Sequence, residues 1–325
     1  MARYSIILGN VGNFSDRFMG CGYGRDYSLD EMFDRVASVQ GVTGVELVSN
    51  WHITAQNVDQ VKRNLERTGL KLVSIIPDHF SVKKYGKGAF TSKDPSIRKQ
   101  AVSDTKELMD IARYLGGDLV SLWPGQDGYD YPFQGDYIEE RTWFEEGVRE
   151  CCRYRADTKI SVEYKIKEPR NFSYPSTVTS TLLMVGGINE PNCGVTIDYG
   201  HGAVAYENLA ESVAILKKYG DKLFHVHMND NYGFWDDDMI TGAIHTIPYI
   251  EFFYWLKRTG YAGYISTDQY PYREDGRDAC NESIRWFEVF EDLVNKIDEQ
   301  RICSIYKTGN ACEISAYMRE LMFNK

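Results

Sequence analysis

Short apolar runs alternate with amphipathic stretches along most of the chain. The runs are rich in β-branched residues and short, as strands that are buried on both faces of a parallel sheet are. They occupy residues 4–8, 43–48, 71–77, 118–123, 159–164, 194–198, 223–228 and 263–268. Because a succession of strand and helix units of this size is the pattern of a (β/α)8 barrel, the sequence predicts an α/β protein with a TIM barrel.

Helical patterns occupy the segments between these runs. Residues 29–39 follow Ser28, a good N-cap, and carry acidic residues in the first turn. The long amphipathic pattern at 94–117 stops at a glycine pair, and the patterns at 207–220 and 246–260 also stop at glycine. We expect residues 1–285 to form the barrel and residues 286–325 to form a short C-terminal helical extension.

The composition excludes several classes of function. The net charge of −10 argues against a nucleic-acid partner, which would need a basic surface. No apolar stretch reaches the length of about 18 residues that a membrane span needs, and the N-terminal segment lacks the pattern of a secretory signal. The seven cysteines are irregularly spaced and include no C-x-x-C pair, so we expect reduced thiols and a cytoplasmic location.

Metal-binding side chains stand at the ends of the last four predicted strands, at Glu163, Asp198, His227 and Asp268. The carboxyl ends of the strands form the active face of such a barrel, and neighbouring strands lie about 4.8 Å apart. Four successive strand ends can therefore converge on one ion. Three carboxylates and one imidazole favour Mn²⁺, Mg²⁺ or Co²⁺ over a structural zinc. A doubly wound sheet, the alternative fold, gives no reason for this placement.

A second group of candidate ligands surrounds the same strand ends. His201 follows Asp198 by three residues in "DYGH", and Asp236 and Asp238 belong to "WDDDM", shortly after His227. An Asp-x-Asp pair with a nearby histidine can hold a second ion that shares Asp198, although an acidic solvent loop would explain "WDDDM" as well. Which two of the three consecutive aspartates bind stays open. We expect one or two ions per subunit, and two would grip neighbouring oxygens of a substrate.

Longer motifs accompany these residues. The segments "FTSKDPSIRKQAV", "LGGDLVSLWPGQDG", "VEYKIKEPR", "DYGHGAVAYENL", "LFHVHMND", "WDDDM" and "STDQYPYREDG" occur in this order. With them the chain resembles the xylose isomerase family over roughly residues 1–275. "VEYKIKEPR" keeps the E-x-K and E-P-R parts of that family's Glu-Pro-Lys-Pro-Asn-Glu-Pro-Arg segment, and "WDDDM" stands where the family has Phe-Asp-Gln-Asp-Leu.

The resemblance implies roles for individual residues. It implies a structural metal held by Glu163, Asp198, His227 and Asp268, and a catalytic metal held by Asp198, His201, Asp236 and Asp238. It also implies that Lys165 hydrogen-bonds the carbonyl oxygen of the substrate and that Trp123 walls the cavity. Phe18 is similar to a phenylalanine that reaches into the site of a neighbouring subunit, as in a homo-oligomeric dimer or tetramer.

The chain departs from xylose isomerases at several positions. Asp198 and His227 stand where those enzymes carry Glu and Asp, and the ligand set is closer to that of L-rhamnose isomerase. Xylose is therefore not the expected substrate. No residue clearly matches the ring-opening histidine, for which His52 and His79 are the two candidates. The C-terminal arm is shorter than in the family, which leaves its tetramer open here.

Three enzymatic functions are compatible with these features. The first is a divalent-metal-dependent aldose–ketose isomerase that acts on a free sugar by a metal-assisted 1,2-hydride shift, with Glu163, Lys165, His201 and Asp268 as catalytic residues. The second is a sugar 3-epimerase in which Glu163 and Asp268 exchange a proton beside a carbonyl. The third is a subunit of a metal-dependent lyase acting on C-glycosides or 3-oxo-glycosides, which would need a partner subunit. An endonuclease on this barrel would need more histidines and a basic groove.

Overall fold

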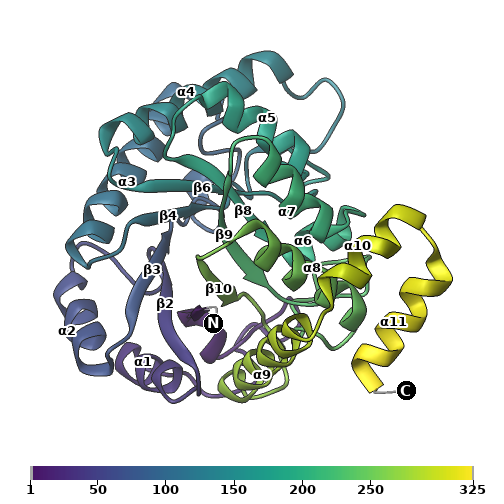
Figure 1. Ribbon diagram of the computed structural model, residues 1–325. Helices are drawn as coiled ribbons and strands as arrows, with labels where there is room; N and C mark the ends of the chain where they lie inside the picture. Colours follow the sequence, from purple (N-terminus) through teal and green to yellow (C-terminus); the bar gives the residue numbers. More distant parts are fainter. Residues whose placement is uncertain (1–2, 324–325) are drawn as a thin grey trace.

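In the computed structural model, which describes residues 3–323, eight parallel strands close into a barrel (Figure 1). They are β1 (Arg3–Ile7), β2 (Val42–Val48), β3 (Lys71–Ile76), β4 (Leu119–Leu122), β6 (Lys159–Glu163), β8 (Cys193–Asp198), β9 (Leu223–Met228) and β10 (Tyr264–Thr267). They follow one another around the barrel in chain order, and β10 pairs with β1. The predicted TIM barrel is confirmed. The short strands β5 (Gly128–Tyr129) and β7 (Phe172–Ser173) form a separate antiparallel pair.

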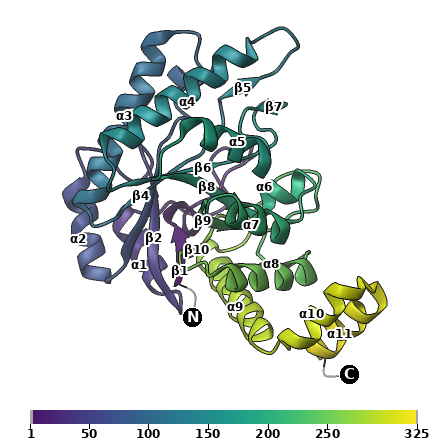
Figure 2. The same ribbon diagram turned by 45° about the horizontal axis from the view of Figure 1, so that its top comes forward.

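Helices follow the strands and cover the outside of the barrel (Figures 1 and 2). They are α1 (Leu29–Ala37), α2 (Val58–Thr68), α3 (Pro95–Tyr114), α4 (Tyr137–Tyr154), α5 (Val178–Ile188), α6 (Tyr199–Val204), α7 (Leu209–Lys218), α8 (Thr246–Thr259) and α9 (Gly276–Asn295). The short 3-10 helices are η1 (Leu8–Val11) and η2 (Lys83–Tyr85). Apolar side chains such as Phe33 of α1 and Phe287 of α9 are fully buried.

Capping residues set the predicted helix boundaries. Ser28 accepts a hydrogen bond from the backbone N–H of Glu31, while the Glu31 carboxylate accepts one from the N–H of Ser28. This reciprocal capping box begins α1 as expected. At the C-terminus of α8, the C-cap Gly260 has a φ of 75°, a left-handed conformation that glycine adopts at little cost and that ends the helix.

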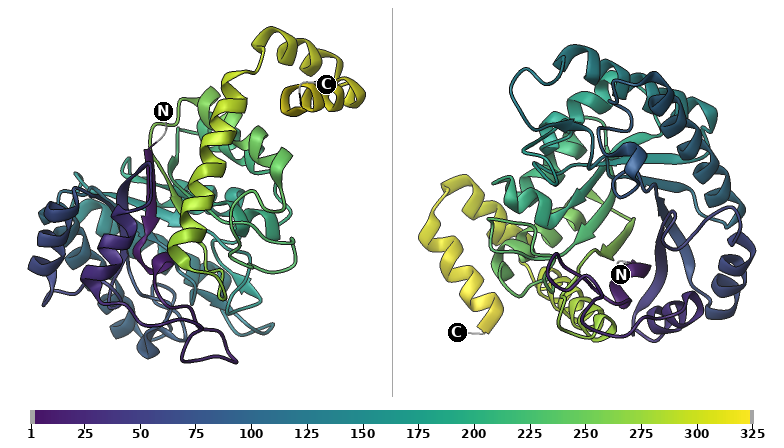
Figure 3. Two further views of the ribbon diagram at one scale, coloured as in Figure 1. Left: turned by 90° about the horizontal axis from the view of Figure 1, so that it is seen from below. Right: turned by 180° about the vertical axis from the view of Figure 1, so that it is seen from behind.

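Two further helices, α10 (Glu299–Thr308) and α11 (Ala311–Phe323), form the C-terminal extension and project to one side of the barrel (Figure 3). The boundary expected after residue 285 falls inside α9. That helix continues to bury apolar side chains as far as Val294, so the extension begins only after α9. The backbone N–H of Asp298 donates to the Tyr317 hydroxyl at 2.7 Å and ties α11 to the start of α10.

The inside of the barrel holds a polar layer. Its side chains are fully buried and include Ser161, Thr196, His225 and Ser266. Each of these four stands two residues before one of the predicted metal ligands, and residues two apart in a strand point to the same side. Thr196 and Ser161 are hydrogen-bonded at 2.6 Å, which confirms that they share a face. The ligands therefore point inward, one layer above this polar layer.

The structure bears on two expectations drawn from the sequence, that the cysteines are reduced and that no segment spans a membrane. All seven cysteines are free, and Cys151, Cys152, Cys193 and Cys280 are buried, in agreement with the expectation of reduced thiols. Over residues 3–323 no helix combines the length and apolarity that crossing a bilayer requires.

Candidate metal centre

The four ligands predicted at the strand ends meet at one end of the barrel. Glu163 ends β6, Asp198 ends β8, His227 is the penultimate residue of β9, and Asp268 follows β10. One ligand atom from each lies within 4.8 Å of the others, and all are buried except Asp268, which is partly buried. Three carboxylates and one imidazole at this spacing suit a single hard or borderline divalent cation.

Unsatisfied atoms indicate that this cluster fits a cation. The Nδ1 atom of His227 lies 3.2 Å from Oε2 of Glu163 and 3.4 Å from Oδ2 of Asp268, yet it is buried without a hydrogen bond. The Oδ1 atom of Asp236, a member of the second cluster described below, is also buried without a partner. Leaving a buried polar atom unpaired costs about 1–3 kcal/mol, a cost that a bound ion would remove. The donor set and the orphaned atoms therefore agree with a metal site.

A second cluster shares Asp198 with the first. Ligand atoms of Asp198, His201 and Asp236 lie within 4.8 Å of one another. The Nδ1 atom of His201 is 3.0 Å from the backbone carbonyl oxygen of Tyr164, to which it donates because a carbonyl oxygen can only accept. The other ring nitrogen, Nε2, faces Asp236 and is the atom that could bind a cation.

Asp198 is held from two sides. As the N-cap of α6 it accepts the backbone N–H of His201 at 2.9 Å. The amide nitrogen of Asn229 also donates to both carboxylate oxygens, at 3.1 and 2.9 Å. Asn229 was not predicted from the sequence, although its position two residues after His227 was a usable signal, because the two side chains share a face.

The three consecutive aspartates differ in position. Asp236 joins the second cluster, whereas Asp237 accepts a hydrogen bond from the backbone N–H of Tyr232 in its own loop. Asp238 lines the cavity beside the metal ligands but does not join the second cluster at the same spacing. Of the alternatives that the sequence left open, Asp236 is therefore the one placed with Asp198 and His201.

Lys165 lies between the second cluster and the cavity. Its ammonium donates to Oδ2 of Asp236 at 2.7 Å and forms an ion pair with Glu168. It also lies 5.3 Å from the centre of the Trp123 ring. Glu168 was not singled out from the sequence. With two carboxylates as partners, the charge of this buried lysine is compensated at the edge of the cavity.

Buried carboxylates control ionisation in the site. Burial raises the pKa of Asp198 to about 7, although the attraction of His201 opposes this. Burial lowers the pKa of His201, but Asp198 and Asp236 outweigh it and bring that pKa to about 9. Burial would raise the pKa of Asp236, yet Lys165 and His201 hold it well below its ordinary value. Protons thus offset part of the negative charge that a cation would neutralise.

A cavity of about 160 Å³ opens onto both clusters. The lining combines apolar and acidic side chains and comprises Ile7, Val48, Trp51, Ile76, Phe80, Trp123, Glu163, Lys165, Glu168, His201, Asp236, Asp238, Asp268 and Tyr270. The Phe80 and Trp123 rings lie 4.6 Å apart and form part of the apolar wall. Pockets for drug-sized ligands measure about 300–1,000 Å³, so this cavity suits a smaller molecule.

The two candidate ring-opening histidines do not line this cavity. The Nδ1 atom of His52 accepts the backbone N–H of Val48 at 2.9 Å, just behind the wall. His79 is buried between Tyr85 and Phe90, with ring centroids 4.7 and 5.6 Å away, and neither of its nitrogens has a hydrogen-bond partner. Both histidines therefore support the structure around the cavity.

Phe18 lies in the loop between η1 and α1, outside the cavity lining. Its side chain is 79% exposed, and the Arg17 guanidinium lies 4.5 Å from its ring centre. An aromatic ring presented in this way is free to contact another molecule. Its role in the site of a neighbouring subunit stays a prediction.

Glu46, in the middle of β2, was also missed. Its buried carboxylate contacts His225 and His227 below the first cluster. A carboxylate within the otherwise apolar strand "VTGVELV" was the available signal, because charged residues are rarely buried without a partner.

Comparisons of sequence relate this chain to proteins that are already known. A family model described as a xylose isomerase-like TIM barrel matches residues 33–289. The xylose isomerase of Thermus thermophilus is 29% identical over 226 residues, which cover 68% of this chain and 58% of that protein. The xylose isomerase of Roseobacter denitrificans is 26% identical over 57% of this chain and 44% of that protein. The chain thus spans about half the length of the curated relatives that it matches.

Comparisons of structure agree on the fold. A D-tagatose 3-epimerase-like protein has a TM-score of 0.71 at 21% identity, over 90% of this chain and 98% of that chain. The D-allulose 3-epimerase from Methylomonas sp. has a TM-score of 0.69 at 17% identity, over 89% and 98%. At such identities the likeness shows a common fold. Because the family model covers most of the barrel, including every strand that carries a candidate metal ligand, the chain belongs to the xylose isomerase-like TIM barrel family.

Proposed function

We propose that the protein is a divalent-metal-dependent isomerase that interconverts an aldose and a ketose by moving a hydride between neighbouring carbon atoms. One observation carries this proposal: two clusters of metal-binding side chains share Asp198 at the carboxyl end of the barrel. Two ions that share one carboxylate ligand can engage two neighbouring oxygens of one substrate. The sequence relatives named xylose isomerase support the same reaction class.

The residues that would hold the ions follow from the two clusters. Glu163, Asp198, His227 and Asp268 would hold the first, while Asp198, His201 and Asp236 would hold the second, with Asp238 as a further candidate. Bound there, divalent cations would supply positive charge for the substrate oxygens that become negative during the reaction. The mixture of carboxylates and imidazoles favours Mn²⁺, Mg²⁺ or Co²⁺.

The protein's own groups would complete the site. Lys165 is held at the edge of the cavity by Asp236 and Glu168, and would donate a hydrogen bond to the carbonyl oxygen of the open-chain sugar. A fixed charge of this kind stabilises a developing negative oxygen without reorganisation. The wall formed by Phe80 and Trp123 would exclude water from the reacting carbon atoms. Hydride transfer needs this exclusion.

The lining of the cavity favours an unphosphorylated sugar. Among the cavity-lining residues within the part of the chain that the structure describes, Lys165 is the only lysine or arginine. Its ammonium is already engaged with two carboxylates, and the other polar lining residues are mainly acidic. A phosphate would meet repulsion at this surface, since phosphate sites usually offer arginine, lysine or a helix N-terminus.

The alternative is a sugar 3-epimerase. It is favoured by the two carboxylates, Glu163 and Asp268, that flank Nδ1 of His227 and border the cavity. Such a pair could remove a proton beside a carbonyl and return it from another side. The titles of several structural neighbours name 3-epimerases, although the low identities limit this argument to the fold.

An isotope experiment separates the two reactions. The purified protein would be stripped with a chelator, reloaded with Mn²⁺ and given, in separate samples, free aldoses that carry deuterium at C2 and free ketoses that carry deuterium at C3. The isomerase proposal expects activity only after reloading, with the C2 label of the aldose recovered at C1 of the ketose. Loss of the C3 label of a ketose to solvent, with formation of its C3 epimer, would favour the epimerase alternative instead. Full activity of the stripped protein would contradict both reactions as proposed here.

A further inference from the structure

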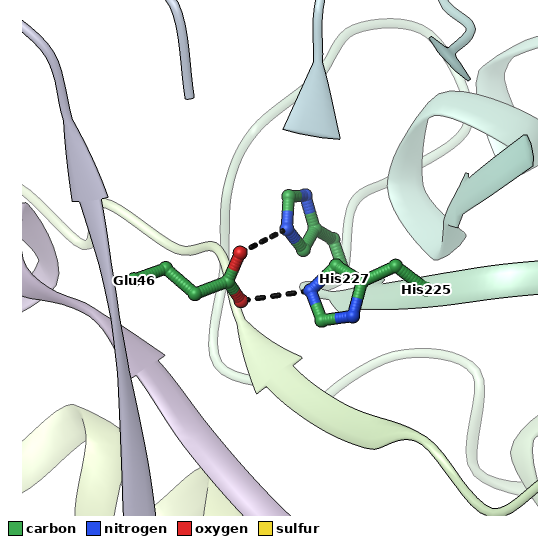
Figure 4. Close-up of side chains that lie close together, drawn as sticks. All are labelled: Glu46, His225 and His227. Atoms are coloured by element: carbon green, nitrogen blue, oxygen red, sulfur yellow. Dashed lines mark hydrogen bonds and ion pairs between the residues drawn. The ribbon is translucent and has the colours of Figure 1, made fainter. Parts of the chain in front are cut away.

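Glu46 is a buried carboxylate for which the proposed reaction has no role. It lies in β2, two strands away from the nearest candidate metal ligand at the barrel wall, and its side chain is fully buried. Its Oε1 atom is 2.8 Å from Nε2 of His225, and its Oε2 atom is 3.3 Å from Nε2 of His227. The carboxylate thus reaches between the two imidazoles of β9 (Figure 4). The hydroxyl of Ser74 also donates to Oε2.

This contact crosses the interior of the barrel. Around the wall, β1 and β10 lie between β2 and β9, so Glu46 cannot meet the histidines as a neighbour in the sheet. Ser74 belongs to β3 and is the register partner of Glu46. Ser74 therefore holds the Glu46 carboxylate from the neighbouring strand β3, while the carboxylate holds the two histidines of β9 across the barrel.

The arrangement determines which nitrogen of His227 faces the cluster. An ionised carboxylate can only accept hydrogen bonds, so Nε2 of His227 carries the proton that points to Glu46. Nδ1 is then the nitrogen that would be free of a proton when a cation is bound, and it points to Glu163 and Asp268, where it has no hydrogen-bond partner. This is the orientation that a metal-binding imidazole needs, since a carboxylate on the far nitrogen fixes both the ring and its tautomer.

We infer that Glu46 is a positioning residue for the metal centre, which holds His227 ready to bind a cation and is itself held by His225 and Ser74. This inference rests on the proposed metal site. A separate ion between Glu46 and the two histidines is the competing explanation for the same cluster. Both oxygens of Glu46 already have donors, however, and the orphaned atom of His227 faces the other way.

The test compares Mn²⁺ affinity in the wild type and in Glu46→Gln. The two imidazoles contact different oxygens of Glu46, and glutamine has an NH2 group in place of one of them, so one imidazole loses the acceptor for its Nε2 proton. The metal-free protein would be titrated with Mn²⁺ while the signal of the free ion is followed by electron paramagnetic resonance. We expect the dissociation constant of Glu46→Gln to rise about 10- to 100-fold. The visible spectrum of the Co²⁺-loaded protein should also change, because the ligand geometry changes.

Glu140→Gln is the matched control, because Glu140 is another buried carboxylate that accepts a hydrogen bond, from the Tyr174 hydroxyl at 2.7 Å, away from the metal centre. It should bind Mn²⁺ like the wild type. Should Glu46→Gln fail to fold, Ser74→Ala removes one restraint on the carboxylate and should weaken Mn²⁺ binding in the same direction. Wild-type affinity in the folded Glu46 or Ser74 variant would overturn this inference alone. A wild type that binds no Mn²⁺ would overturn the metal site and this inference together.

Discussion

The Nε2 atom of His201 lies 3.2 Å from Oδ2 of Asp236, and this contact joins α6, the short helix after β8, to the loop after β9. The second cluster depends on it, whereas Glu163, His227 and Asp268 meet without it. We therefore predict that His201→Asn loses one of two bound Mn²⁺ ions and retains the other. Equilibrium dialysis followed by elemental analysis measures the number of ions bound per chain.

Asp237→Asn is the control for this prediction, because Asp237 is adjacent to Asp236 but its carboxylate accepts a hydrogen bond from its own loop and belongs to neither metal-binding cluster. It should retain the Mn²⁺ content of the wild type. Equal metal content in the wild type and in His201→Asn would mean that the second cluster does not bind an ion, and the epimerase alternative would then gain support.

Replacing Lys165 separates charge stabilisation from metal binding. In Lys165→Met the ion pair with Asp236 is lost while every candidate ligand remains. We expect kcat to fall about 10²- to 10³-fold, as when a fixed donor to a negative oxygen is removed, with Mn²⁺ still bound. Steady-state kinetics on the best aldose, together with metal analysis, provides the measurement.

Lys167→Met is a suitable comparison for Lys165→Met. Lys167 is two residues away and lies over the Trp235 ring, outside the cavity lining. Its kcat should stay close to that of the wild type. If Lys165→Met kept full activity, the lysine would have only the structural role of an ion-pair partner.

The sequence predicted the ligands at the strand ends because each of them obeys a local rule. Glu163 and Asp198 end apolar strands, and such ends gather on one face of a barrel. The partners of Glu46 escaped prediction for a different reason. The contact from Glu46 to His225 crosses the interior between strands that are not neighbours, and it depends on the stagger of the closed barrel. No local pattern encodes that stagger.

His79 should make folding stability depend on pH. Burial lowers the pKa of this histidine to about 4, below its ordinary value of about 6.5. Above pH 6.5 neither the folded nor the unfolded state binds the proton, so stability is undiminished. As the pH falls toward 4, only the unfolded state binds it, and the free energy of unfolding decreases, by about 2 kcal/mol at pH 5. Phenylalanine cannot be protonated and fits between Tyr85 and Phe90.

We therefore predict that the free energy of unfolding of His79→Phe, relative to that of the wild type, is about 2 kcal/mol higher at pH 5 than at pH 7.5. Urea unfolding at both pH values measures this change, and His52, which is also buried, contributes equally to both proteins. An unchanged difference would show that burial does not lower the pKa of His79 in the folded protein. The same variant should keep its activity at pH 7.5, since the ring does not line the cavity.

Gly200, in the "DYGH" motif, leaves room for the amide that holds Asp198. A β-carbon at this position would overlap Oδ1 of Asn229, whose nitrogen donates to both oxygens of Asp198. Gly200→Ala should therefore displace Asn229, release Asp198 and weaken Mn²⁺ binding by about 10- to 100-fold. Isothermal titration with Mn²⁺ measures the effect.

Gly186→Ala is the matched substitution, because a β-carbon on Gly186 in α5 meets nothing within 4 Å. Alanine is also favoured over glycine inside a helix by about 0.5–1 kcal/mol, so this variant should be slightly more stable and bind Mn²⁺ normally. Thermal unfolding without metal distinguishes a local effect on Asp198 from a general loss of structure. If folded Gly200→Ala bound Mn²⁺ as tightly as the wild type, Asn229 would not be needed to orient Asp198, and the bridging carboxylate would be held by its position at the start of α6 alone.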